Sequence, residues 1–165
     1  MTAKNDRRQE PTINRFNFVP HYLGVLSNSF LWSQSRYFLH TYDLGVNEIR
    51  VISVLAYSDE LSATGLCDAL VMNKSIVSRT LGRLQEKEII VTDGGGRNQT
   101  FRLTDLGYDF NAKIVKISLA REKRLLRGLS DTDRVILLGY MAKMVDNLDH
   151  AGNFAEIIPP LELGD

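Results

Sequence analysis

The most informative stretch of the sequence runs from residue 73 to residue 87: Asn73-Lys74-Ser75-Ile76-Val77-Ser78-Arg79-Thr80-Leu81-Gly82-Arg83-Leu84-Gln85-Glu86-Lys87. Asparagine is a favoured helix N-cap, so Asn73 predicts a helix over about 74–87. At about 100° per residue, Val77, Leu81 and Leu84 lie on one side of this helix, with Thr80 beside them. This apolar stripe predicts that the helix packs onto its own domain.

The opposite side of this helix carries hydroxyl and guanidinium donors and a glycine: Ser75, Ser78, Arg79, Gly82 and Arg83. A helix that enters the major groove of duplex DNA needs donors for phosphate oxygens and guanine edges, and small residues that permit close approach. Gly82 costs about 1 kcal/mol relative to alanine in a helix interior, which close approach would explain. The alternative is a solvated face of an ordinary surface helix.

The neighbouring segments favour the first of these interpretations. Ser62 predicts the N-cap of a short helix over about 63–70, and a tight turn joins it to the helix that follows Asn73. Two short helices joined in this way are typical of a helix-turn-helix. Short β-prone runs at 89–91 and 99–103 flank the glycine-rich residues 93–98, which predicts a β-hairpin, or wing.

Longer helices are expected on both sides of this lobe. Pro20 suits the start of a helix that runs to about Tyr42, and Asn47 is predicted to cap the next one. Thr104 predicts the cap of a long helix that Gly128 breaks. Residues 130–133, Ser-Asp-Thr-Asp, resemble a capping box ahead of a last helix to about residue 148. The predicted fold is mainly α, with a winged lobe at 46–104 between terminal helices at 1–45 and 105–165.

These terminal helices carry more apolar residues than a small lobe can cover by itself, which predicts a homodimer. The alternative is a monomer whose helices pack on their own lobe.

Composition and charge narrow the class of protein. The chain has 165 residues, of which 44% are hydrophobic and 24% charged, typical of a globular domain. No apolar run approaches the roughly 18 residues of a membrane span, and no signal peptide is recognisable, so we expect no membrane partner and a cytoplasmic location. The net charge is zero, yet residues 71–127 carry +6, against −1 for 1–70 and −5 for 128–165. A basic middle segment favours a polyanionic partner.

The ordered set of motifs resembles the MarR family of bacterial transcriptional regulators over nearly the whole chain. The matching stretches are Val46–Ile52, Asn73–Arg79, Leu84–Ile90 and Leu103–Gly107, the last with the family's Leu-Thr-x-x-Gly junction. The resemblance implies a homodimer that binds a pseudo-palindromic operator in double-stranded DNA. It also implies control, most often as a repressor, by a small aromatic acid bound between the dimerisation helices and the winged lobe.

The sequence departs from the family at two places. The wing keeps the arginine of the usual Asp-x-Arg pattern, Arg97, but Gly95 replaces its acid and the wing is shorter. Glu88 stands where the family favours glycine.

The candidate DNA-binding residues lie on the recognition helix and the wing tip: Asn73, Lys74, Ser75, Ser78, Arg79, Arg83, Arg97 and Asn98. The candidate effector-binding residues lie in or near the first helix, where a cation and aromatic rings would suit an aromatic carboxylate: Arg15, His21, Ser29 and Trp32. For each of the latter, ordinary packing is the alternative.

Two other function classes are alternatives to a DNA-binding regulator. A winged-helix protein-interaction module without DNA binding should have lost the cations of its recognition face, yet Lys74, Arg79 and Arg83 remain. An enzyme is not expected, because no phosphate-binding glycine loop, nucleophile–base pair or paired carboxylates can be placed together. We expect no metal and no cofactor, because one cysteine and three scattered histidines give no zinc-site spacing. Cys67 is expected to be a small core residue.

Overall fold

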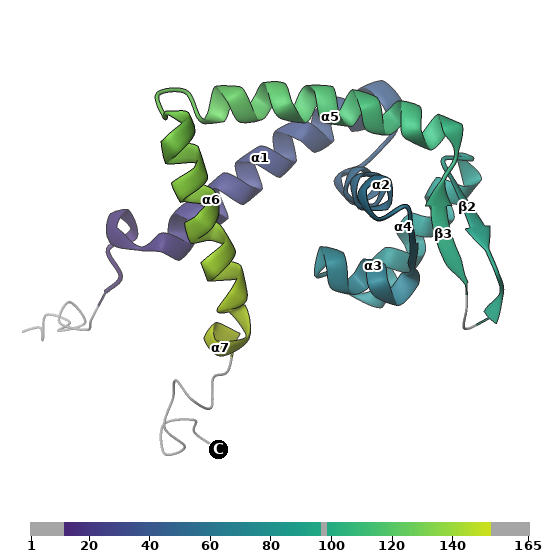
Figure 1. Cartoon of the computed structure of the whole chain (residues 1–165), viewed down its shortest axis with the longest axis horizontal. Helices are drawn as coiled ribbons and strands as arrows, with labels where there is room; N and C mark the ends of the chain where they lie inside the picture. The colour runs from purple at the N-terminus through teal and green to yellow at the C-terminus, as the bar shows by residue number, and fades with distance from the viewer. Residues whose placement is uncertain (1–11, 97–98, 153–165) are drawn as a thin grey trace, which may run out of the picture. The chain divides into compact units, whose positions relative to one another are not determined.

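The structure, a computed structural model, describes residues 12–96 and 99–152. The elements in chain order are the short 3-10 helix η1 (Arg15–Asn17), α1 (Val19–Tyr42), α2 (Val46–Ser58), β1 (Glu60–Ser62), α3 (Ala63–Leu70), α4 (Lys74–Glu86), β2 (Ile90–Asp93), β3 (Thr100–Leu103), α5 (Asp105–Leu125), α6 (Asp131–Asp146) and α7 (Leu148–Gly152). The predicted mainly helical, winged helix-turn-helix fold is confirmed (Figure 1). The chain divides into two compact units, and the boundary in the sequence falls between Val115 and Lys116.

Helix starts follow the predicted capping residues at four places. The Ser62 hydroxyl accepts a hydrogen bond from the Gly65 N–H at 3.1 Å, and the Asn73 side chain accepts one from the Ile76 N–H at 3.0 Å. The Thr104 hydroxyl accepts from the Gly107 N–H at 3.1 Å. The capping box at α6 is complete: the Asp133 N–H donates to the Ser130 hydroxyl, and the Asp133 carboxylate accepts from the Ser130 N–H at 2.8 Å.

Two local predictions are wrong, and one strand was not predicted. Asn47 is not a cap, because α2 already begins at Val46 and Gly45 takes the N-cap position. The last long helix ends at Asp146, where Asn147 is the C-cap, and a separate short helix, α7, follows. The sheet has a third strand, β1, at residues 60–62. Three residues are too few to show the alternation by which a strand is recognised in a sequence.

The sheet is antiparallel in the order β1-β3-β2, so the second strand of the hairpin is central. Its register pairs Glu60 with Arg102 on one side and Val91 with Arg102 on the other. Phe101 and Leu103 of β3 are buried, while Arg102 between them is exposed, as the two-residue period of a strand requires. The wing is therefore joined to the helix-turn-helix by β1 as well as by the chain.

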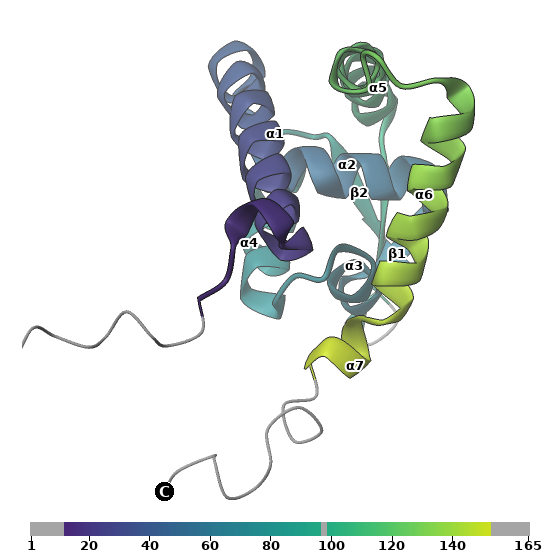
Figure 2. The same ribbon diagram turned by 90° about the vertical axis from the view of Figure 1, so that its left-hand side faces the viewer.

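The core of the first unit forms where α2, α3 and α4 meet each other and the sheet (Figures 1 and 2). The predicted apolar stripe of α4 is confirmed, because Val77, Leu81 and Leu84 are at most 3% exposed and Thr80 is 4% exposed. Further buried residues come from α1, α2, α3, α5, the chain between elements and the sheet: Phe38, Leu44, Ile49, Val51, Ile52, Leu55, Leu66, Leu70, Ile89, Ile90, Phe101, Leu103 and Ile114.

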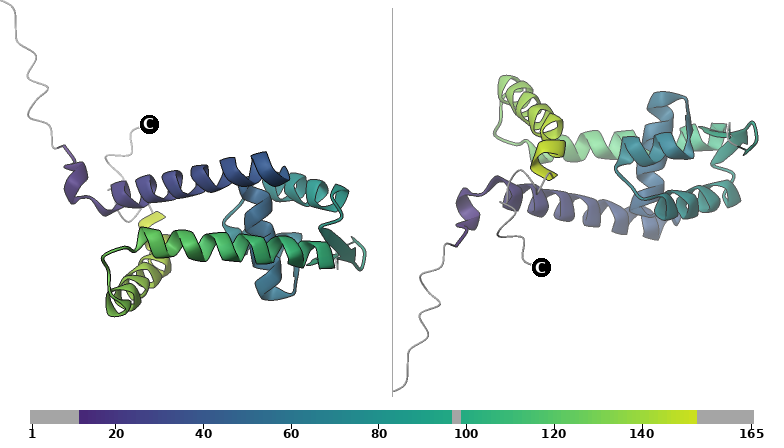
Figure 3. Two further views of the ribbon diagram at one scale, coloured as in Figure 1. Left: turned by 90° about the horizontal axis from the view of Figure 1, so that it is seen from above. Right: turned by 90° about the horizontal axis from the view of Figure 1, so that it is seen from below.

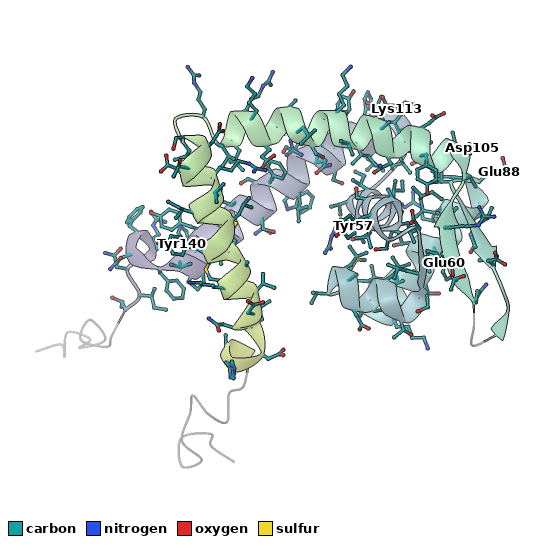
Figure 4. All side chains as sticks on the ribbon, viewed as in Figure 1. Tyr57, Glu60, Glu88, Asp105, Lys113 and Tyr140 are labelled. Carbon is teal, nitrogen blue, oxygen red and sulfur yellow. The ribbon has the colours of Figure 1, made fainter. Side chains whose placement is uncertain are left out.

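A ring cluster joins the end of α1 to the beginning of α5 within the same unit. The rings of Tyr42 and Phe110 lie 5.8 Å apart and edge to face. The Lys113 ammonium lies 5.3 Å from the first ring and 4.9 Å from the second (Figure 4). Such ring and cation contacts add to the apolar burial there.

The Leu-Thr-x-x-Gly junction is a point of close backbone packing. The Ile89 carbonyl accepts hydrogen bonds from the Thr104 N–H at 3.0 Å and from the Thr104 hydroxyl at 3.1 Å. A Cβ at Gly107 would lie only 2.3 Å from that carbonyl oxygen, so this position accepts glycine alone without a backbone shift. Glu88, the residue before Ile89 (labelled in Figure 4), has a φ of +57°. This is the left-handed conformation that favours glycine.

The terminal helices leave much apolar surface uncovered. In α6 no residue is buried, and Val135, Tyr140 and Val145 are each more than 60% exposed. The helix α1, seen as one continuous helix in Figure 3, buries only Gln34 and Phe38. Exposed large apolar residues of α1 include Val19, Val25, Leu26 and Trp32. Helices with this much bare apolar surface normally meet a partner.

Candidate nucleic-acid interface

The first half of α4 presents the polar face that the sequence predicts. Lys74, Ser75, Ser78 and Arg79 are all exposed, on the side of the helix away from its buried stripe. The described residues offer no acidic side chain within ion-pair distance of Lys74 or Arg79. This part of α4 is therefore an exposed, positively charged surface with hydroxyl groups between the cations.

Hydrogen bonds order several of these side chains. The Ser75 hydroxyl donates to the Asn73 carboxamide oxygen at 2.9 Å, and that oxygen also accepts the cap hydrogen bond. The Asn73 amide N–H groups are left as donors. The Arg79 Nε–H donates to the Ser75 carbonyl at 3.2 Å, so its terminal guanidinium nitrogens are free to reach outward. A guanidinium held in this way can present two parallel donors to a phosphate or a guanine edge.

The second half of α4 differs, because its cations are paired with acids. Arg83 Nη1 lies 3.1 Å from Glu48 Oε1, and Arg83 Nη2 lies 3.8 Å from Asp43 Oδ1. Lys87 Nζ lies 2.5 Å from Asp43 Oδ2. The hydrogen bond and charge of Lys87, aided by the charge of Arg83, lower the pKa of Asp43 below its usual value of 3.8. Sequence reasoning missed these pairs, since the partners lie more than 30 residues apart and no spacing rule links them.

A second contact from α2 reaches the turn of the helix-turn-helix. Arg50 Nη2 donates to the Leu70 carbonyl at 2.6 Å, at the C-terminus of α3. A cation there satisfies an unpaired carbonyl and the negative end of the helix. The turn itself places Val71 at a φ of +50°, 88% exposed. Arg50 therefore helps to fix the direction in which the chain leaves α3 toward α4.

The wing adds one exposed cation among the residues that the structure describes. Arg102 of β3 is exposed and pairs in register with Glu60 of β1. Arg97 and Asn98, the predicted minor-groove residues at the wing tip, lie outside the described residues. Gly94 and Gly96 before them have positive φ angles, as the predicted glycine-rich turn requires.

The candidate effector residues are not gathered in one place within a single chain. His21 and Trp32 both belong to α1 and are separated by eleven residues, which is about 16 Å along the helix. Arg15 stacks over the Phe16 ring at 4.7 Å, and His21 packs against the ring of Tyr22. Ser29 is exposed and uses its carbonyl to accept a hydrogen bond from Ser33.

Trp32 lines an apolar cavity of about 190 Å³ in the first unit, together with Asn28, Leu31, Ser35 and Val46. A larger hollow of about 580 Å³ lies next to it, lined by residues of α1, the start of α2 and α4: Ser35, Leu39, Gly45, Val46, Asn47, Glu48, Ile76, Arg79, Thr80 and Arg83. Cys67 is half-buried rather than a core residue, and it borders a shallow hollow at the turn with Val71 and Met72.

Residues 12–96 and 99–152 also bear on other classes of function. Within these ranges no helix is long and apolar enough to cross a membrane. The same residues contain no group of three or more His, Cys, Asp or Glu side chains placed to hold a metal ion.

Comparison with known proteins gives a consistent result. The MarR family model matches residues 42–97. No curated protein matches the chain. Among solved structures, a MarR/EmrR family transcriptional regulator from Acinetobacter sp. ADP1 is 26% identical, with a TM-score of 0.76 over 84% of this chain and 99% of that one.

Two similar structures were solved with DNA. The S. aureus MepR–DNA complex is 19% identical, with a TM-score of 0.70 over 82% of this chain and 99% of that one. A putative MarR family regulator from Listeria monocytogenes, complexed with a 26mer DNA, is 16% identical, with a TM-score of 0.74 over 80% and 89%. The matched segment contains α2, β1, α3, α4 and β2, and so includes the helix that carries the exposed basic face, α4. Residues 42–97 therefore match the MarR family model, and the chain has the winged-helix fold of MarR family transcriptional regulators.

Proposed function

We propose that this protein regulates transcription by binding duplex DNA through the exposed face of α4. The observation that carries the proposal is the first half of that helix, where Lys74 and Arg79 stand exposed beside Ser75 and Ser78 and form no ion pair with any described residue. Asn73 adds amide donors at the helix start. The two similar structures that hold DNA support the same use of the fold.

Binding should depend steeply on salt, because each phosphate contact releases condensed counterions. The slope of log affinity against log salt concentration should be about −0.9 for each phosphate neutralised. Fluorescence anisotropy with a pool of genomic fragments, at several salt concentrations, measures both the slope and the sequence preference. If no fragment is preferred over random duplex at any salt concentration, the proposal is wrong.

Arg79 and the wing should contribute differently. Arg79→Ala should cost about 1–3 kcal/mol and relax the preference at one operator position, because a guanidinium in the major groove reads a base edge. Arg97→Ala and Asn98→Ala should weaken binding more uniformly, because the minor groove carries a degenerate code. Binding-site selection with each variant separates the two effects. An unchanged preference in the Arg79 variant would count against a base contact.

We further propose that the active form is a homodimer held by the terminal helices. The apolar residues of α6 surround the helix and none is buried, which is the pattern of a helix enclosed by partners. A second copy of the chain supplies such a partner with the two-fold symmetry that a pseudo-palindromic operator needs. One winged lobe then enters each half-site, with the half-sites about one helical turn apart.

Substitution in α6 tests the dimer. Val145→Lys places a charge on a residue that is 63% exposed in the single chain, and we expect it to shift the molecular mass in solution toward that of one chain. Asp146→Lys introduces the same side chain at the next position and is the control. Sedimentation equilibrium measures both. A wild-type protein that sediments as a single chain at micromolar concentration would contradict the proposal.

We also propose that a small aromatic carboxylate releases the protein from DNA, so that it acts as a repressor. The cavity at Trp32 has the size and apolar lining for an aromatic ring, and it lies between α1 and the start of α2. A ligand there can alter how α1 sits on the helix-turn-helix. A coupling of about 1–3 kcal/mol gives a 5–150-fold loss of operator affinity.

The effector proposal has a built-in optical probe, because Trp32 is the single tryptophan. Benzoate-, phenylacetate- and cinnamate-type acids should change its fluorescence, and Trp32→Ala should weaken their binding in calorimetry. Arg15→Ala, His21→Ala and Ser29→Ala test whether residues nearer the start of α1 contribute. By reciprocity, saturating operator should weaken the acid by the same factor by which the acid weakens the operator. An acid that binds free and DNA-bound protein equally well is not the effector.

A further inference from the structure

Two acids at the junction of α1 and α2 hold the last turn of α4. Asp43 is the C-cap of α1, and Glu48 lies in the first turn of α2. Between them they bind both cations at the end of α4, Arg83 and Lys87. The end of the recognition helix is thus attached to the two helices that precede the helix-turn-helix.

The pair between Glu48 and Arg83 differs from ordinary surface pairs in its burial. The Glu48 side chain is only 6% exposed, whereas that of Arg83 is 47% exposed. A carboxylate taken out of water needs a charged partner close by, and removing that partner leaves an uncompensated buried charge. Among the described residues, the charged partner that Glu48 has is Arg83.

The backbone at Gly45 makes room for this arrangement. A Cβ at residue 45 would lie 2.6 Å from Glu48 Oε2. The Glu48 carboxylate therefore lies back over the N-cap of α2, in space that a side chain at residue 45 would contest. Glycine at this position leaves the carboxylate room to lie where it meets Arg83.

The cations of α4 consequently fall into two groups. Lys74 and Arg79 are exposed and have no ion pair among the residues described, so they are available to a polyanion. Arg83 directs Nη1 at Glu48 and Nη2 toward Asp43, so a phosphate that recruited it would compete with both carboxylates.

We infer that Arg83 is a positioning residue, which sets the orientation of α4 for DNA through its ion pair with Glu48 and makes no phosphate contact of its own. The inference rests on the proposed function, and it departs from the sequence-based expectation that Arg83 binds DNA. Together with the Arg50 contact to α3, it makes α2 the element against which both helices of the helix-turn-helix are fixed.

Glu48→Gln separates the two roles by the sign of its effect. If Arg83 contacted phosphate, removing the negative charge beside it would strengthen DNA binding. If Arg83 positions α4 through Glu48, the same change loosens the helix and weakens binding. We expect a loss of about tenfold for Glu48→Gln and for Arg83→Gln, and a double variant no weaker than either alone.

The salt slope supplies the second readout, with Lys74→Gln as the matched control. Loss of a phosphate contact lowers the slope by about 0.9 per contact, which we expect for Lys74→Gln. Arg83→Gln should lower affinity with the slope unchanged, and Arg83→Lys should recover part of the loss. Circular dichroism and urea unfolding establish that each variant is folded at the temperature of the assay.

The outcomes distinguish this inference from the proposed function. A wild-type protein that selects no DNA overturns the proposed function and this role with it. A wild-type protein that selects an operator, combined with a Glu48→Gln variant that binds it more tightly or an Arg83→Gln variant with a lowered slope, overturns the positioning role alone.

Discussion

Gly107→Ala tests the close packing between the start of α5 and the end of the recognition-helix segment. The added methyl group would lie 2.3 Å from the Ile89 carbonyl oxygen and 3.1 Å from two carbons of Leu103. Contacts of a Cβ below 3.0 Å essentially do not occur, so the backbone must separate by at least 0.7 Å. Backbone cannot turn aside as a flexible side chain does, and α5 must move away from Ile89.

The cost follows from what that movement disturbs. The Ile89 carbonyl accepts two hydrogen bonds from Thr104, at 3.0 and 3.1 Å, and both are strained when α5 moves. Each contributes about 1 kcal/mol, and overpacking adds about 1–3 kcal/mol. Alanine regains up to about 1 kcal/mol of helix propensity. We expect a net loss of about 2–4 kcal/mol in the free energy of unfolding.

Urea unfolding monitored by circular dichroism measures this loss as a lower midpoint with an unchanged slope. Gly82→Ala is the matched control, because a Cβ at that position meets nothing within 4 Å and the same propensity gain should stabilise the protein by about 0.5–1 kcal/mol. If Gly107→Ala were as stable as the wild type while Gly82→Ala behaved as expected, the argument from the 2.3 Å contact would be refuted.

Three further outcomes are expected. Gly82→Ala should weaken operator binding although it stabilises the fold, because it adds a methyl group to the face that approaches DNA; anisotropy compares it with the wild type. Val71→Asn should raise the free energy of unfolding by about 1 kcal/mol, since asparagine tolerates the φ of +50° that strains a β-branched residue. Ser130→Ala should raise the pKa of Asp133, which hydrogen bonds from the Ser130 hydroxyl and N–H now hold below 3.8, while Thr132→Ala should leave it unchanged in an NMR titration. Because that pKa is lowered by folding, the stabilisation is present above pH 4 and is lost as the pH falls through the folded-state pKa. The difference in stability between wild type and Ser130→Ala should therefore shrink in acid to the pH-independent loss of the cap hydrogen bond from the Asp133 N–H.

Local signals in the sequence were sufficient for most helix boundaries. The side chains of Ser62, Asn73, Thr104 and Ser130 cap helices within their own turn, so their residue types and spacing carry the information. The prediction for Asn47 was wrong for a related reason. Asparagine is a favoured N-cap residue, but here it lies inside the first turn of α2, and Gly45 takes the N-cap position without a side-chain hydrogen bond.

Features that depend on distant residues were not predictable in the same way. The pairing of Glu60 with Arg102 and the ion pair of Glu48 with Arg83 each join residues that no local period connects. Sequence reasoning placed Arg83 correctly on the polar side of α4, but only the fold places a buried carboxylate beside it. The effector residues illustrate the opposite case, because proximity in sequence suggested a cluster that the rigid length of α1 keeps apart.

The position of β3 between its two neighbours has a consequence for the order in which the lobe assembles. Joining β2 to β3 closes a loop of the six residues 94–99, whereas joining β1 to β3 closes one of the thirty-seven residues 63–99. Loop-closure entropy makes the second step more costly by about 1.6 kcal/mol if the loop is unstructured. Formation of α3 and α4 shortens the path that must be closed, so the strand at 60–62 should join the hairpin only after both helices exist. The recognition helix would then be completed before the wing is fixed beside it, and folding of the lobe would be limited by this last, long-range pairing.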